Sequence, residues 1–110
     1  MKKRITQIQL KEIINYDEST GVFTWIKPTS TRFNAGDIAG HSDSKGYVHI
    51  TINGGRYLAH RLAWLYVHGV WPKEQVDHIN HTPSDNRMVN LREATNQENG
   101  KNQSIYSTNT

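Results

Sequence analysis

The residues best suited to chemistry in this sequence are an adjacent acid and imidazole, Asp77 and His78, inside the short stretch Gln75–Ile79. Neighbouring residues of a strand point to opposite faces, so one side chain can bind a metal ion while the other is aimed from a different direction. Histidine is both a usual metal ligand and the side chain that exchanges protons near neutral pH. Taken alone, the pair is better explained as a structural salt bridge or capping pair.

The residues after this pair supply more polar side chains in a regular order. A turn-rich loop at 80–86 leads to an ordered element at 88–91, and 91–94 could return as a second short strand. Residues 95–98 have the spacing of a capping box, which predicts a helix that carries Asn99 and Lys101 in its early turns. The sequence therefore predicts a ββα arrangement near its C-terminal end.

The elements before the pair are expected to be small antiparallel strands and helices, which makes the fold class α+β. A helix should begin after Thr6, with five apolar residues roughly on one face: Ile5, Ile8, Leu10, Ile13 and Ile14. A strand is predicted at 22–26, an irregular connection at 27–46, and a hairpin at 47–58 that turns at Asn53-Gly54. A second helix should run from Ala59 to about Val67 and end at Gly69.

Composition limits what the chain can be. With 110 residues it is expected to form about one domain, and without cysteine it has neither disulfides nor thiolate zinc ligands. Any metal must then be held by His, Asp, Glu or Asn. The sequence has no apolar run of the ~20 residues that span a bilayer and no apolar signal segment, so a cytoplasmic protein is expected. The formal net charge of +3 mildly favours polyanionic partners.

Several segments, in this order and spacing, resemble the HNH (ββα-metal) nuclease motif of phage homing endonucleases. The motif segments are Val76-Asp77-His78-Ile79, Ser84-Asp85-Asn86-Arg87, Asn90-Leu91-Arg92 and Glu98-Asn99. Residues 59–64 and 17–25 also resemble segments that precede the motif in that group. The resemblance extends from about residue 10 to about residue 102. It divides the chain into an N-terminal region with a DNA-binding ribbon at 1–58, a nuclease core at 59–102 and a flexible tail at 103–110.

This resemblance implies a DNA endonuclease that uses one divalent metal ion, Mg²⁺ or Mn²⁺. By position, Asp77 matches a metal-binding carboxylate and His78 the general base that activates water. Asn90 matches the Asn that braces the loop and orients the base, and Asn99 matches a second metal ligand. Hydrolysis of a phosphodiester needs an activated water, a Lewis acid and a stabilised leaving oxygen, which these residue types can supply. The nitrogen of His78 that does not act as base should be held by a backbone carbonyl or by Asn90.

The expected partner is double-stranded DNA, bound by a monomer or weak dimer, in the host cytoplasm if the protein is phage-encoded. Lys45 and Arg56 could contact DNA from the ribbon, while the resemblance places Lys101 against the minor groove. His60 could contact phosphate, although a residue in its position is more often a cap or a packed side chain. Arg61 could contact the DNA backbone from the exposed side of its helix, but it could equally be a solvated charge. A non-catalytic DNA-binding module and a metal-stabilised protein-interaction domain are the alternative functions.

The sequence departs from the family pattern just after the acid–histidine pair. Family members often have an Asp-Gly turn where this chain has Asn80-His81. His81 could be a spare ligand, a phosphate contact or only a turn residue. Family members also commonly carry a further DNA-binding module after the motif. This chain ends too soon for one, so a truncated or weakly specific enzyme is expected.

Overall fold

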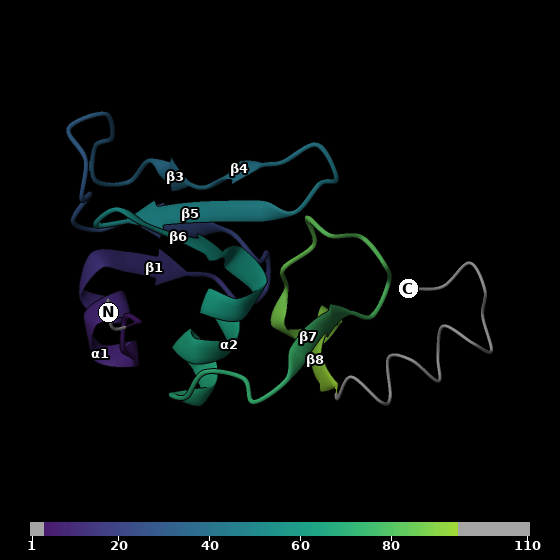
Figure 1. Cartoon of the computed structure of the whole chain (residues 1–110). Coiled ribbons are helices and arrows are strands. Elements are labelled where there is room, and N and C mark those ends of the chain that lie inside the picture. The colour runs from purple at the N-terminus through teal and green to yellow at the C-terminus, as the bar shows by residue number, and fades with distance from the viewer. Residues whose placement is uncertain (1–3, 95–110) are drawn as a thin grey trace.

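The computed structural model describes residues 4–94. Two helices, eight short strands and one 3-10 turn follow one another in this part of the chain. Strand pairs are antiparallel throughout, so the expected α+β class is confirmed. In Figure 1, α2 lies between α1 on one side and the β7–β8 pair on the other, with the long strand β5 above. Within the described residues, none of the helices has the length and apolar character needed to span a membrane.

The first helix, α1, covers Gln7–Ile13 and begins at the predicted cap. The Thr6 hydroxyl accepts a hydrogen bond from the Gln9 backbone N–H, and the Gln9 side chain accepts one from the Thr6 N–H, which together form a capping box. The expected apolar face is partly wrong, because Ile8 is exposed and Ile14 already belongs to the next strand. The helix ends early because residue 14 takes an extended backbone conformation.

The structure contains two three-stranded sheets, and the segment at residues 38–42 contributes one strand to each of them. One contains β1 (Ile14–Tyr16), β2 (Phe23–Trp25) and β3 (Ile38–Ala39). The other contains β4 (His41–Ser42), β5 (Val48–Ile52) and β6 (Gly55–Leu58), with the predicted turn at Asn53-Gly54 confirmed. The connection 27–46 is therefore less irregular than expected, because β3 and β4 pair with strands whose sequences carry the stronger apolar pattern.

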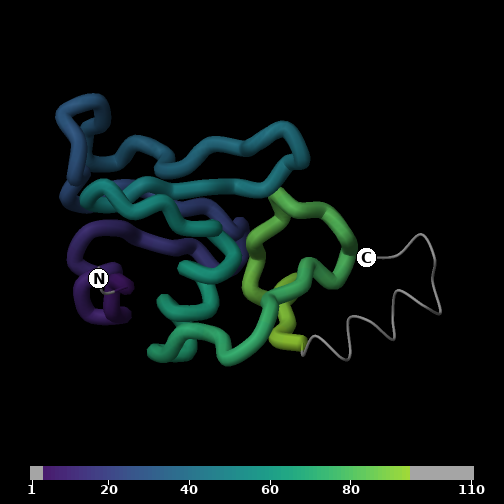
Figure 2. The backbone as a smooth tube through the Cα atoms, viewed as in Figure 1, coloured from purple at the N-terminus to yellow at the C-terminus, as the bar shows by residue number. Residues whose placement is uncertain are grey.

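The second helix and the last strand pair also follow the prediction. Helix α2 covers Ala59–His68 and ends at Gly69, which has a left-handed φ of 83°. Strand β7 (Gln75–His78) pairs with β8 (Leu91–Ala94), and the 3-10 turn Met88–Asn90 precedes β8. The helix expected from Thr95 lies outside the described residues. Figure 2 shows the loop between β7 and β8 beside the turn that joins β4 and β5.

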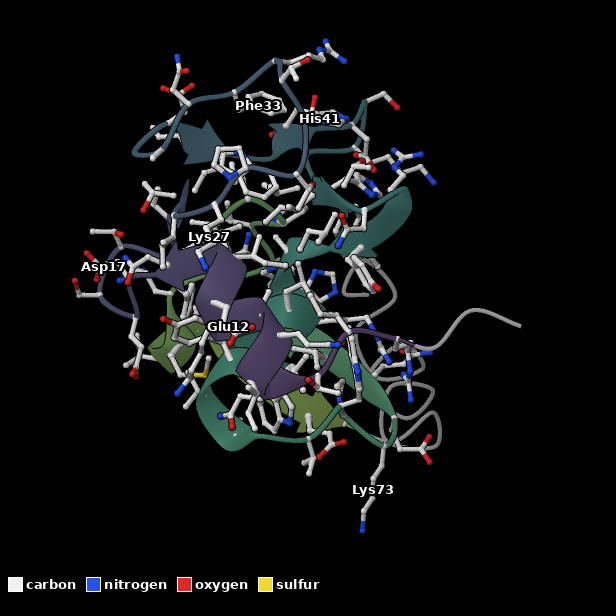
Figure 3. All side chains as sticks on the ribbon, turned by 90° about the vertical axis from the view of Figure 1, so that its left-hand side faces the viewer. Glu12, Asp17, Lys27, Phe33, His41 and Lys73 are labelled. Carbon is white, nitrogen blue, oxygen red and sulfur yellow. The ribbon has the colours of Figure 1, made fainter. Side chains whose placement is uncertain are left out.

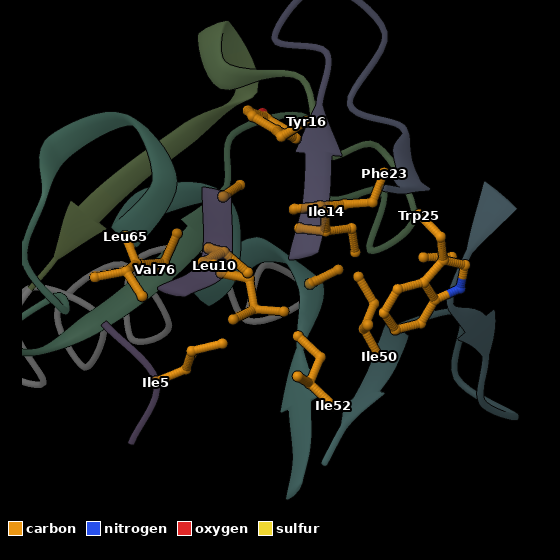
Figure 4. Packing of buried hydrophobic residues seen from close by; sticks show 14 of the residues in the cluster. Ile5, Leu10, Ile14, Tyr16, Phe23, Trp25, Ile50, Ile52, Leu65 and Val76 are labelled. Carbon is orange, nitrogen blue, oxygen red and sulfur yellow. The ribbon is translucent and has the colours of Figure 1, made fainter. Parts of the chain in front are cut away.

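One cluster of buried apolar side chains joins these elements. Leu10 of α1, Ile14 of β1, Ile50 of β5 and Leu62 of α2 are fully buried, and Val76 of β7 packs into the same cluster (Figure 4). Buried residues before and after residue 58 belong to this one core. The predicted division at residue 58 into a DNA-binding region and a nuclease core therefore stays a prediction about function. The α1 side of the molecule, away from β7 and β8, presents Glu12, Asp17 and Lys27 to solvent (Figure 3).

Candidate functional site

The acid–histidine pair lies in a cleft of about 630 Å³ between three parts of the chain. Its walls come from the β4–β5 turn, the start of α2, and strand β7 with its following loop. The residues of this cleft that can bind ions or exchange protons are Asp43, Lys45, Tyr47, His60, Arg61, Asp77, His78 and His81. The structure therefore brings together five of the predicted site residues: Lys45, His60, Arg61, Asp77 and His78.

His78 is held in one orientation by an amide that the sequence did not single out. Its Nε2 lies 2.8 Å from Oδ1 of Asn86, and both side chains are buried. An amide oxygen only accepts hydrogen bonds, so Nε2 carries the proton and donates it. Nδ1 is then left with the free electron pair. The acceptor is thus Asn86, not the backbone carbonyl or Asn90 amide that was expected.

Residues of the N-terminal region contact the backbone of Asn86 and hold it in place. The hydroxyl of Tyr16 donates to the Asn86 carbonyl at 2.5 Å. Burial, with the nearby Glu18 and Asp17 carboxylates, raises the pKa of Tyr16 above its ordinary value, so the hydroxyl keeps the proton that it donates. Gly21, with φ of 78°, approaches so closely that an added Cβ would lie 2.4 Å from the Asn86 carbonyl carbon. Residues 16–21 therefore support the group that orients His78.

The Asn90 side chain hydrogen-bonds to the loop between β7 and β8 at three points. Its amide nitrogen donates to Oδ1 of Asn80 at 2.9 Å and to the Asp85 carbonyl at 2.8 Å, while its oxygen accepts from the Asn80 backbone at 2.9 Å. Asn80 also donates to the Asp85 carboxylate at 2.8 Å. Hydrogen bonds from Arg87 and Asn80 lower the pKa of Asp85, which keeps the carboxylate ionised. These contacts close the loop between β7 and β8.

Asp77 supplies the only carboxylate of β7, and its side chain is half-buried in the cleft. Arg92, its partner in β8, places Nη2 3.7 Å from Oδ2, a loose contact between partly exposed groups. Among residues 4–94 no group of three His, Asp or Glu side chains is placed to hold a metal ion. One carboxylate in an open cleft nevertheless fits Mg²⁺, which binds few protein ligands and keeps several waters.

His60 lies at the start of α2 with its ring against that of His78. The ring centroids are 4.7 Å apart in an edge-to-face arrangement, and only 6% of His60 is exposed. Burial, and secondarily the neighbouring His78, lower the pKa of His60 to about 3. Its Nδ1 is buried without a hydrogen-bond partner among the described residues. His60 is therefore uncharged at neutral pH, and its proposed contact with phosphate stays a prediction.

The buried His60 predicts a loss of stability in mild acid. The unfolded chain protonates this imidazole below about pH 6.5, whereas the folded chain resists protonation down to about pH 3. The unfolded state therefore binds more protons in this window, and stability falls as the pH falls. Between pH 7 and pH 5 this group should remove about 2 kcal/mol from the free energy of unfolding. Urea unfolding at both pH values should show a smaller loss for His60→Phe; equal losses in the two proteins would contradict the assignment.

The β4–β5 turn carries Lys45, one of the residues predicted to contact DNA. Asp43 accepts hydrogen bonds from the backbone N–H groups of Lys45 and Tyr47 at 2.9 and 3.0 Å, and contacts His49 Nε2 at 2.7 Å. The hydrogen bond with His49, followed by those from the backbone, lowers the pKa of Asp43. This turn holds Tyr47 with its ring 6.0 Å from the rings of both His60 and His78.

The remaining predicted DNA contacts are distributed differently. Arg61 is half-buried in the cleft wall, and its Nη1 donates to the Glu74 carbonyl at 3.2 Å. Arg56 lies on a separate groove with Arg4 and Tyr57 and does not line the cleft. Asn99 and Lys101 lie outside the described residues. The sequence did not indicate three residues of the site, Asp43, Tyr47 and Asn86, although Asn86 stands in the Ser84–Arg87 motif segment.

Comparison with known proteins identifies the same region. Residues 57–101 match a family model described as HNH endonuclease, which confirms the resemblance for that segment. The fold is similar to the solved structure reported as "DNA binding and cleavage by the HNH homing endonuclease I-HmuI", with a TM-score of 0.67 and 24% sequence identity. The similarity covers 87% of this chain and 54% of that one, so the chain spans about half of its length. No curated protein matches the sequence. The family match supports a DNA nuclease or DNA-binding role.

Proposed function

We propose that this chain is a metal-dependent DNA endonuclease in which His78 takes a proton from the attacking water. The orientation of His78 carries the proposal. Its Nε2–H donates to Asn86 at 2.8 Å, and Nδ1 remains as the basic nitrogen of a side chain that lines an open cleft. A general base needs this combination of a fixed ring and a free electron pair.

Asp77 and Asn99 are the residues that would hold one divalent ion, Mg²⁺ or Mn²⁺. When bound, such an ion supplies a Lewis acid for the scissile phosphate and the leaving oxygen. His78 accepts the water proton at Nδ1 and becomes an imidazolium whose other N–H stays bonded to Asn86. Asn90 keeps the loop closed beneath this pair through its bonds to Asn80 and Asp85.

Double-stranded DNA is the proposed substrate because the cleft combines the reactive pair with Lys45 and Arg61. Phosphate contacts from such cations supply most of the affinity of sequence-independent binding. Arg56, His60 and Lys101 complete the proposed set of DNA contacts. The net charge of +3 has the sign that a polyanionic partner requires.

Incubation with supercoiled plasmid tests the proposal. We expect nicked or linear product in Mg²⁺ or Mn²⁺ and no product in excess EDTA, with DNA binding followed in parallel by a mobility shift at low salt. Binding without product under all conditions would instead identify a non-catalytic DNA-binding module. Cleavage that persists in EDTA would contradict the use of a metal.

Asn86 should act as a positioning residue for His78. Asn86→Ala removes the acceptor for Nε2–H, so we expect kcat to fall about 10- to 100-fold with little change in KM. Asn86→Asp places a carboxylate at the same ring nitrogen and favours the protonated imidazole, so the acidic limb of the rate profile should move to higher pH. Asn15→Ala, at an exposed position of β1, is the control. An unmoved profile in Asn86→Asp would reduce Asn86 to a structural role.

A further inference from the structure

His81 adopts a left-handed backbone conformation that is uncommon for residues other than glycine. Its φ is 63°, and among the described residues Asn53 is the other non-glycine residue with positive φ. Asn53 occupies a hairpin turn, where asparagine is a usual choice. Histidine is enriched in this conformation relative to most other residues, but glycine adopts it without steric cost. The chain thus keeps a side chain at a turn position where glycine would be unstrained, and residues in such conformations cluster at functional sites.

The surrounding loop fixes where the His81 side chain begins. The His81 backbone N–H donates to the His78 carbonyl at 3.0 Å, which ties this residue to the proposed base. On its other side, Thr82 N–H donates to the Asn80 side chain at 2.9 Å, and Asn90 holds Asn80 in turn. The imidazole lines the same cleft as Asp77 and His78.

Within the described part of the chain, no contact stabilises the His81 imidazole itself. His81 is exposed, and its ring has no hydrogen bond or ion pair with residues 4–94. The exposed imidazole can therefore contact a ligand in the cleft. An imidazole N–H is a donor suited to phosphate oxygen. A shared metal ion is less well supported, since no three ligating side chains gather here within the described residues.

We propose that His81 binds a phosphate oxygen of the DNA backbone beside the scissile bond, an inference that rests on the proposed function. The His81 imidazole makes a substrate contact that a glycine at position 81 could not make. The contact is formed with bound DNA before the chemical step, so its loss should weaken binding more than turnover.

Steady-state cleavage kinetics and thermal melting of His81→Gly test this assignment. Glycine keeps the backbone conformation without strain but adds conformational entropy to the unfolded chain, so we expect the Tm to stay within a few degrees of the parental value. KM should rise about 10-fold, the cost of one hydrogen bond to a charged group, while kcat stays within about twofold. His81→Asn, which tolerates positive φ and keeps a shorter donor, should have an intermediate KM. His68→Ala removes an exposed imidazole at the other end of α2 and should leave both constants unchanged.

The outcomes separate this inference from the proposed function. A His81→Gly protein that cuts with the parental KM would make His81 a turn residue and overturn the inference alone. A fall in kcat that extra Mn²⁺ restores would identify a metal ligand and would also overturn it. A parental protein that cuts no DNA would overturn the proposed function and this inference together.

Discussion

Replacing His78 with alanine should lower kcat for DNA cleavage by about 10²- to 10⁴-fold, the usual contribution of a general base. The substitution removes the imidazole that Asn86 orients and leaves Asp77 and the cations of the cleft in place. DNA affinity, measured by fluorescence anisotropy in Ca²⁺, should therefore stay close to the parental value. Single-turnover cleavage of a labelled duplex in Mg²⁺ measures the rate.

Two controls keep this result interpretable. His78 is buried, so circular dichroism must first show that the variant is folded at the assay temperature. Added imidazole should then restore part of the lost rate, because it can occupy the space left by the side chain. A folded His78→Ala protein that cuts at the parental rate would exclude His78 as the base.

Replacing Gly21 with alanine should cost about 3 kcal/mol of stability, the sum of left-handed strain and of overlap with a packed backbone. The new Cβ would lie 2.4 Å from the Asn86 carbonyl carbon and 2.5 Å from the Arg87 nitrogen. Neither of these backbone atoms can move without shifting the amide that orients His78. The variant should therefore lose cleavage rate as well as stability, although residue 21 makes no contact with DNA in this proposal.

Gly36→Ala is the matched control for this effect. Gly36 also has a positive φ, 94°, but an added Cβ there meets no atom within 4 Å. It should cost only the strain of the left-handed conformation, about 1–2 kcal/mol, and leave kcat unchanged. Urea unfolding and cleavage rates of the two variants check the difference. Equal losses in both would mean that the approach of Gly21 to Asn86 has no role.

The local elements could be predicted where a residue pattern determines them directly. Thr6 caps α1, Asn53-Gly54 turns the hairpin, and Gly69 ends α2, because each of these residue types favours its backbone conformation locally. The apolar pattern misplaces Ile14 because periodicity does not show where a short helix ends, and it misplaces Ile8 because this residue lies on the opposite side of α1 from the buried Leu10. The short strands β3 and β4 escaped prediction because their pairing depends on β2 and β5.

The site could be predicted only in part for a related reason. Asp77 and His78 are adjacent in the sequence, so their chemistry is visible there. The support for His78 combines Asn86, eight residues away, with Tyr16, which is 70 residues before Asn86. No local pattern distinguishes Asn86 from Asn80 or Asn90, and only the folded loop shows which amide meets the imidazole. The burial of His60 is likewise a property of tertiary packing.

The division of labour between Asp77 and His78 is tested most directly by a crystal structure of the full chain with Mn²⁺, located by its anomalous scattering. We expect one ion bound by the Asp77 carboxylate and Asn99, with His78 Nδ1 one water molecule away and Nε2 still bonded to Asn86. An ion bound directly by His78, or an Asp77 carboxylate that binds no ion, would contradict these roles.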